Sequence, residues 1–123
     1  MMLAVEVFLV LVGAGVGAVL RYLIGGWVGH RMGPGFPWGT LAVNTLGCLE
    51  LGFLIGFAPE ENVALFILSG GIIGGFTTFS TLMFESSNLA LSGQSRRSAV
   101  NIAANFALGF IALFIGTYLG ATL

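Results

Sequence analysis

The segment GGIIGGFTTFSTL, residues 70–82, carries the features that decide the fold. Paired glycines followed by paired threonines make a poor continuous helix, because each glycine costs about 1 kcal/mol relative to alanine. The segment lies inside an apolar stretch, residues 62–91, that is long enough to cross a bilayer. We therefore predict a transmembrane helix broken near the bilayer centre. On composition alone, an unbroken helix with a glycine packing face is the alternative.

A break in this helix would free backbone carbonyl groups at membrane depth. Such groups persist only where protein or a cavity satisfies them, and freed carbonyls commonly coordinate a cation. After the break, Phe79 and Leu82 are three residues apart and share one helix face, with Glu85 a turn further on. The hydroxyls of Ser80 and Thr81 lie beside that face.

The composition places the whole chain in a membrane. Of 123 residues, 57% are hydrophobic and 7% are charged, and the mean hydropathy is +1.03. So few charges cannot cover a soluble surface. Four spans are expected, at about 5–29, 38–57, 62–91 and 98–119, and they form one all-α transmembrane domain over residues 1–123. A net charge of -1 without a basic run argues against a nucleic-acid partner.

The loops carry an asymmetric charge. Four spans put both termini and the Glu60 loop on one side, and the loops with Arg31, Arg96 and Arg97 on the other. The positive-inside rule predicts that the arginine loops are cytoplasmic, which favours a fixed orientation. Glycine pairs four residues apart, such as Gly13 and Gly17, predict close helix packing. Four helices are too few to enclose a transport pathway, so a second subunit is expected.

The chain contains few of the residue types that enzymes use for catalysis. It has one histidine, no aspartate, no lysine and a single cysteine, Cys48. No nucleophile–base pair or set of metal-ligating side chains can be assembled from them. We predict that the protein is not an enzyme.

Two polar stripes run along otherwise apolar spans. Thr40, Asn44 and Cys48 recur with period four, and so do Asn101 and Asn105. Their amide and hydroxyl groups could donate hydrogen bonds to an anion, whose transfer without water into hydrocarbon costs tens of kcal/mol. The alternative is that the asparagines join helices to one another. Three ionisable residues also lie in apolar surroundings, which marks each as a functional candidate: Arg21, Glu50 and Glu85.

Three ordered motifs resemble the Fluc (CrcB-type) fluoride channels. They are GGFTTFST at 74–81 with Glu85 following, GAVLRY at 17–22, and PWGTLAVN at 37–44. The resemblance covers essentially the whole chain. It implies an antiparallel, dual-topology dimer in the cell membrane of a prokaryote, with two pores that passively export fluoride from the cytoplasm.

The resemblance also implies roles for individual residues. A structural Na+ at the dimer centre would take the backbone carbonyls of Gly74 and Thr77, and Arg21 would lie near the aqueous vestibule. The pore would be lined by residues of the second, third and fourth spans: Thr40, Asn44, Phe79, Ser80, Thr81, Leu82, Glu85, Asn101 and Asn105. Leu82 replaces the family's second pore phenylalanine and lacks an electropositive ring edge.

The composition of the dimer stays open at this level. Leu82 and the arginine bias together motivate a heterodimer with an oppositely oriented homologous subunit, whereas the family pattern allows a homodimer. Two other functions remain alternatives. One is a small proton-coupled multidrug exporter that uses Glu50 as its membrane-embedded acid. The other is a non-conducting assembly subunit of a heterodimeric channel, in which the polar residues only join helices.

Overall fold

The computed structural model describes residues 2–57 and 62–123, and all regular structure within them is helical. The helices are α1 Met2–Met32, α2 Trp38–Phe57, α3 Val63–Phe76, α4 Phe79–Leu91 and α5 Ser95–Ala121. Helices α3 and α4 belong to one apolar stretch, Val63–Leu91. Counted this way, the chain has four helical stretches that are long and apolar enough to cross a membrane. The prediction of an all-α, multi-pass membrane protein is confirmed.

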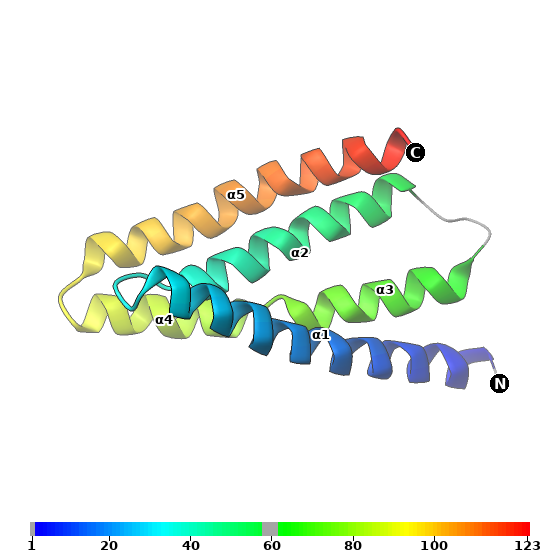
Figure 1. Ribbon diagram of the computed structural model, residues 1–123, viewed down its shortest axis with the longest axis horizontal. Helices are drawn as coiled ribbons and strands as arrows, with labels where there is room; N and C mark the ends of the chain where they lie inside the picture. The colour runs from blue at the N-terminus through cyan, green and yellow to red at the C-terminus, as the bar shows by residue number, and fades with distance from the viewer. Residues whose placement is uncertain (1, 58–61) are drawn as a thin grey trace.

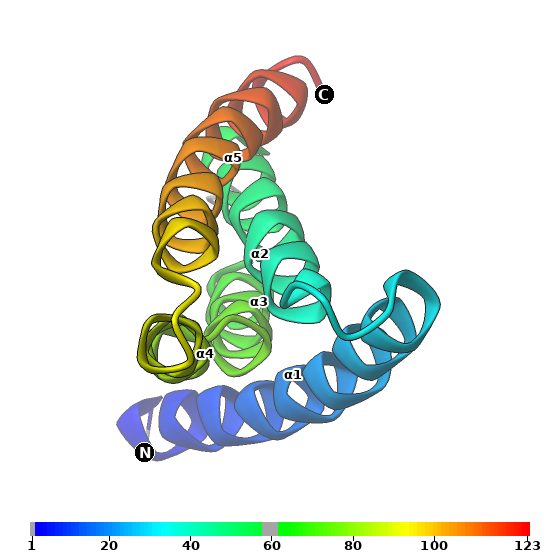
Figure 2. The same cartoon turned by 90° about the vertical axis from the view of Figure 1, so that its left-hand side faces the viewer.

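The helices associate mainly as two pairs. Helix α2 packs along α5, and α1 packs along α3 (Figures 1 and 2). Helix α4 packs against the first part of α5, next to the loop that joins them. Glycines make both pairings close. A Cβ atom at Gly17 or Gly75 would collide with the backbone across the α1–α3 contact, and one at Gly52 or Gly116 would do so across the α2–α5 contact. These glycines therefore form the packing faces that their spacing indicates.

Several helix ends differ from the predicted bounds. Helix α1 continues to Met32 because its stop is Gly33, whose φ of 87° suits glycine and whose N–H donates to the Gly29 carbonyl at 3.0 Å. Helix α5 begins at Ser95, three residues before the expected start. Asn62 caps α3 by accepting the Leu65 N–H at 3.0 Å. The loop that contains Glu60, at residues 58–61, lies outside the described residues.

Both chain termini lie at one end of the molecule, and the α1–α2 and α4–α5 loops lie at the other (Figure 1). This arrangement agrees with the topology expected for four crossings. The α1–α2 loop is joined to the start of α5, because Arg97 Nη1 donates to the Gly35 carbonyl at 2.9 Å. At the same end, the Arg31 guanidinium lies 5.5 Å from the ring centre of Trp27, a cation–π contact.

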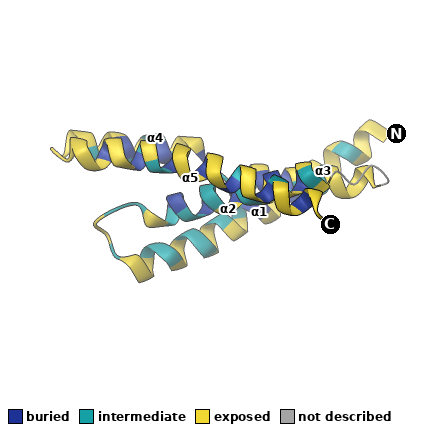
Figure 3. Ribbon diagram, turned by 90° about the horizontal axis from the view of Figure 1, so that it is seen from above, coloured by how far each residue is buried: buried dark blue, intermediate teal, exposed yellow. Residues whose placement is uncertain are grey.

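The enclosed core is small and unusually polar. Buried positions are confined to the helix contacts, while most large apolar side chains are exposed, as expected for a surface in lipid (Figure 3). In the described parts of the chain, seven hydrophobic residues are buried beside six polar ones. The buried polar residues are Thr40, Thr78, Ser86, Ser98, Asn101 and Asn105. Since buried polar groups require partners, their hydrogen bonds locate the candidate site.

Candidate functional site

The site is built around the interruption between α3 and α4. Thr77 (φ −81°, ψ 158°) and Thr78 (φ −150°, ψ 119°) have extended backbones. The Thr77 N–H still donates to the Ile73 carbonyl at 3.0 Å, whereas the Thr78 N–H bonds elsewhere. The Gly74 carbonyl therefore loses the donor that a continuous helix would give it.

Asn44 on α2 takes over both hydrogen bonds of Thr78. Its Oδ1 accepts the Thr78 N–H at 2.8 Å, and its Nδ2 donates to the Thr78 carbonyl at 3.0 Å. Nδ2 also donates to Oδ1 of Asn105 on α5 at 2.9 Å. A broken helix is tolerated in a membrane only where such partners replace the lost bonds. Asn44 is therefore the residue that satisfies the interruption.

Thr78 starts the second half of the broken helix. Its Oγ1 accepts the Thr81 N–H at 3.2 Å and donates to the Thr81 Oγ1 at 2.9 Å, so it caps α4. Thr78 was not among the predicted site residues. A threonine directly after a predicted break is in the position of an N-cap, and this signal could have identified it.

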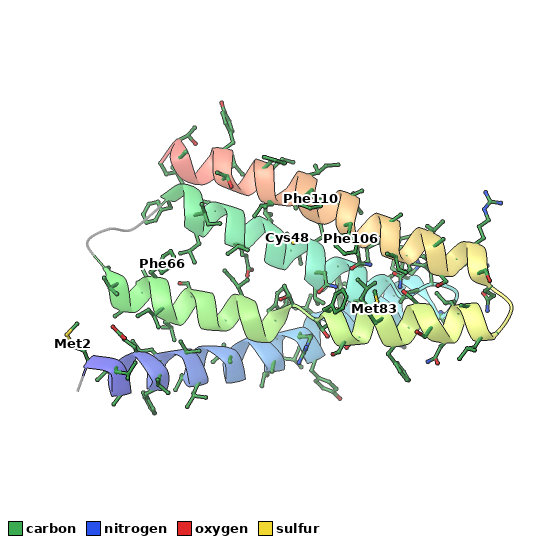
Figure 4. The ribbon with its side chains drawn as sticks, turned by 180° about the vertical axis from the view of Figure 1, so that it is seen from behind. Met2, Cys48, Phe66, Met83, Phe106 and Phe110 are labelled. Carbon is green, nitrogen blue, oxygen red and sulfur yellow. The ribbon has the colours of Figure 1, made fainter. Side chains whose placement is uncertain are left out.

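Two cavities meet at Thr78. The smaller, of about 310 Å³, is lined by the predicted residues Asn44, Thr77, Phe79, Leu82 and Asn105. Cys48 and the exposed rings of Phe106 and Phe110 lie around it (Figure 4). The larger, of about 890 Å³, is lined by the predicted residues Arg21, Thr40, Thr81 and Glu85. The structure thus divides most of the predicted site between two cavities that share one threonine.

The larger cavity contains the charged residues of the site. Arg21 Nη1 donates to the Thr77 carbonyl at 3.3 Å. Thr40 Oγ1 donates to Glu85 Oε1 at 2.9 Å, while the buried Oε2 of Glu85 has no hydrogen-bond partner. One carboxyl oxygen of Glu85 therefore accepts the Thr40 hydroxyl, and the other oxygen remains available as an acceptor.

Other predicted residues occupy different environments. Asn101 has no exposed surface and donates to Ser86 Oγ at 3.0 Å. Ser80 is exposed and borders neither cavity. Phe79 is 65% exposed, whereas Leu82 is only 3% exposed. The fourth-span stripe is therefore not an open continuation of the polar track, since its first amide is enclosed by protein.

The carbonyls at the end of α3 suit a cation in part. Hard cations prefer oxygen ligands and require several of them. The Gly74 carbonyl lacks its helical donor and its residue is exposed, while the Thr77 carbonyl also accepts from Arg21. No cluster of three metal-ligating side chains occurs within residues 2–57 and 62–123. The backbone oxygens fit Na+ by type, but one chain offers only part of a coordination shell.

A membrane helix broken beside two cavities, a largely apolar one and one that contains Arg21 and Glu85, is the architecture of a channel or transporter. Comparison with known proteins identifies the family. A model described as "CrcB-like protein, Camphor Resistance (CrcB)" matches residues 8–117, and the chain belongs to this family.

Curated relatives match nearly the whole chain. "Fluoride-specific ion channel FluC 1" of Rubrobacter xylanophilus is 58% identical over 94% of this chain and 94% of its own. "Fluoride-specific ion channel FluC" of Dehalococcoides mccartyi is 42% identical over 96% of this chain and 94% of its own. The protein of that name from Rhizobium etli is 40% identical over 91% and 93%. Since these proteins are named as channels, the prediction that the chain is not an enzyme is confirmed.

Proposed function

We propose that this chain is a passive channel for fluoride. The names of its relatives support this function. The observation that carries it is the interruption between α3 and α4. Asn44 satisfies the backbone of Thr78 there, and α4 starts beside two cavities. The first N–H groups of a helix have no helical partner and lie at the positive end of its dipole, which favours an anion.

Hydrogen-bond donors near this helix start would replace the water around fluoride. The hydroxyls of Ser80 and Thr81 belong to the first turn of α4. Thr81 and Thr40 line the larger cavity, whereas Ser80 lies outside both cavities and would act only at the exposed surface of α4. The exposed ring of Phe79 lines the smaller cavity, where its electropositive edge would attract an anion. Arg21 would raise the local anion concentration at the vestibule.

The channel is proposed to be an antiparallel dimer with two pores. One chain leaves the smaller cavity open, and the aromatic residues around it are exposed: Phe79, Phe106 and Phe110. A Cβ atom at Gly70 or Gly74 would meet nothing within 4 Å, so this face of α3 has no close partner among residues 2–57 and 62–123. A second copy packed on it would complete both features. We place this dimer in the cell membrane of a prokaryote, surrounded by lipid and exporting fluoride down its gradient.

A structural Na+ would bind at the centre of such a dimer. Gly74 and Thr77 would each supply a carbonyl oxygen, and the second copy would supply the same pair. When bound, the ion would neutralise the negative end of α3. Replacing Na+ by N-methylglucamine should then lower the thermal unfolding midpoint of the dimer. An unchanged midpoint would argue against the ion.

Whether the partner is identical or homologous depends on Leu82 and the loop arginines. A side chain without a ring at position 82 alters the same place in both pores of a homodimer. Three arginines at the helix ends beside the α1–α2 and α4–α5 loops, Arg31, Arg96 and Arg97, favour one orientation. An antiparallel homodimer that can be cross-linked and conducts fluoride would exclude an obligate heterodimer.

Glu50 supports the exporter as a second candidate. It lines a separate cavity of about 530 Å³ that is otherwise mostly apolar. However, the aromatic residues of that cavity are Phe53 and Phe57, and neither tryptophan nor tyrosine lines it. Saturable, pH-coupled transport of organic cations would favour this function.

The hydrogen bonds of the asparagines support the alternative of a non-conducting assembly subunit. Asn44, Asn101 and Asn105 all donate to protein acceptors, as helix-joining residues do. On this alternative, replacing Asn44 would lower stability in a complex whose fluoride flux comes from the other subunit.

The decisive experiment is fluoride efflux from liposomes that contain the purified chain, followed with a fluoride-selective electrode. Fast efflux with chloride retained supports the channel and shows that Leu82 is tolerated in a homodimer. No efflux from folded protein indicates a missing subunit. Continued absence of efflux after co-expression with an oppositely oriented homologue would overturn the channel proposal.

A further inference from the structure

A chain of buried amides connects α5 to the interruption. Asn44 Nδ2 donates to Asn105 Oδ1 at 2.9 Å. Asn105 Nδ2 donates to the Asn101 carbonyl at 2.9 Å and to Asn101 Oδ1 at 3.2 Å. Asn101 Nδ2 donates to Ser86 Oγ at 3.0 Å, and the Ser86 carbonyl accepts from Ser98 Oγ at 2.7 Å. We refer to Asn44, Asn105, Asn101 and Ser86 as the amide relay.

The relay has one direction. An asparagine amide has one oxygen that accepts and one nitrogen that donates. Because Asn105 uses its oxygen for Asn44, its nitrogen must point to Asn101, and the Asn101 nitrogen must then point to Ser86. Turning any one amide over would place donor against donor or acceptor against acceptor. The orientations of the three amides are therefore set together, and hydrogen bonds in such a chain strengthen one another.

The orientation of Asn44 matters because of Thr78. Only with its oxygen toward the Thr78 N–H and its nitrogen toward the Thr78 carbonyl does Asn44 satisfy both groups. The bond to Asn105 selects this orientation over the reverse one. The amide relay thereby couples the amide orientations on α5 to the backbone of Thr78 at the start of α4.

The burial of the relay indicates that its α5 amides orient Asn44 and do not contact an ion directly. Asn101 has no exposed surface, and Asn105 is 7% exposed. All of the donor contacts of both amides described here go to protein acceptors. We propose that Asn105 and Asn101 are positioning residues that act on fluoride permeation through Asn44, and that they do not themselves bind the ion. This inference rests on the proposed channel function.

A double-mutant cycle tests the relay. Asn44→Ala, Asn105→Ala and the double variant are reconstituted, and initial fluoride efflux is measured per folded protein, together with the thermal unfolding midpoint. Loss of one hydrogen-bonded contact corresponds to a change of about two- to tenfold, so Asn105→Ala should reduce efflux by up to about tenfold. The double variant should remain within about twofold of Asn44→Ala, since Asn105 acts through Asn44. Asn88→Ala, at an exposed amide on α4, is the matched control and should conduct like the wild type.

The outcomes separate this inference from the proposed function. If the efflux losses multiply, Asn105 acts independently and the relay is overturned. If folded Asn105→Ala protein conducts fluoride as fast as the wild type, the Asn44–Asn105 contact serves only helix packing. This result would also overturn the relay. If the wild type conducts neither alone nor after co-expression with an oppositely oriented homologue, the channel proposal fails, and the unfolding midpoints still decide the coupling. Non-additive midpoint shifts would support the relay, whereas additive shifts would remove it.

Discussion

Asn44 holds Thr78 by both of its backbone polar groups, accepting its N–H at 2.8 Å and donating to its carbonyl at 3.0 Å. A side chain from one helix thus replaces the helical hydrogen bonds that another helix lacks. The two residues are 34 positions apart in the sequence. The interruption is therefore a tertiary feature as much as a local one.

Replacing Asn44 by leucine should destabilise the fold strongly. The substitution places an apolar side chain of similar size at the position and leaves the Thr78 N–H and carbonyl buried without their Asn44 partners. Each unsatisfied group costs about 1–3 kcal/mol, so the loss of both should lower the unfolding free energy by about 2–6 kcal/mol. Thermal unfolding in detergent checks this. A midpoint equal to that of the wild type would show that water or another group satisfies Thr78.

The neighbouring Thr45→Val substitution should have the opposite effect. Thr45 Oγ1 is buried and has no hydrogen-bond partner among the residues that the structure describes, so burial of the hydroxyl carries a desolvation cost without a compensating bond. Removing it should be neutral or raise stability by about 1 kcal/mol. The same unfolding measurement applies, and a clear decrease in the midpoint would reveal a partner for this hydroxyl.

Thr40→Val should impair fluoride efflux through Glu85. The substitution removes the one hydroxyl that donates to the Glu85 carboxyl, whose second oxygen already has no partner. We expect efflux to fall by about tenfold, the equivalent of one hydrogen bond to a charged group. Thr40→Ser retains the hydroxyl and should stay within about threefold of the wild type. Equal losses in both variants would mean that the methyl group, and not the bond, is what matters.

Leu82→Phe should be tolerated and should increase fluoride efflux. Leu82 borders a cavity of about 310 Å³, which gives a larger ring space to extend into. Enlarging a packed side chain typically costs about 1–3 kcal/mol, and the adjoining cavity should keep the cost near the lower end of that range. The added ring edge offers fluoride a second electropositive contact. Met83→Phe places a ring about 100° around the helix and serves as the control; an equal gain there would argue against a specific role for position 82.

Two glycines on α3 should respond differently to alanine. Gly75 lies against the backbone of α1, and a methyl group there would collide with Ala14, so Gly75→Ala should lower the stability of each chain. A Cβ atom at Gly74 would meet nothing within 4 Å in the described part of the chain, so Gly74→Ala should leave the chain folded and weaken the proposed dimer. Unfolding midpoints and the fraction of cross-linked dimer distinguish the two. A normal dimer yield in Gly74→Ala would show that the two copies meet elsewhere.

The spans and their packing faces were accessible from the sequence because they depend on local properties. Apolar length identifies each crossing, and glycines four residues apart identify the faces of Gly17 and Gly52. The segment 70–82 also indicated a weak helix by its composition. The location of the interruption at Thr77 and Thr78 could not be derived in this way, because Asn44 on another helix determines it.

The asparagines show a second limit of reasoning from spacing. Period four correctly placed Asn101 and Asn105 on one face of α5. Spacing cannot say which acceptors meet those amides, since Ser86 and Asn44 reach them from other helices. We expected these amides to extend an anion track, but for Asn101 the structure favours the alternative of bonding between helices.

The position of both chain ends at the same end of the molecule constrains how two copies can be fused. In an antiparallel pair, the C-terminus of one copy and the N-terminus of the other face opposite sides of the membrane. A flexible linker alone would force a genetic tandem into the parallel arrangement. A functional single-chain version needs one added crossing between its halves, a helix of about 20 apolar residues.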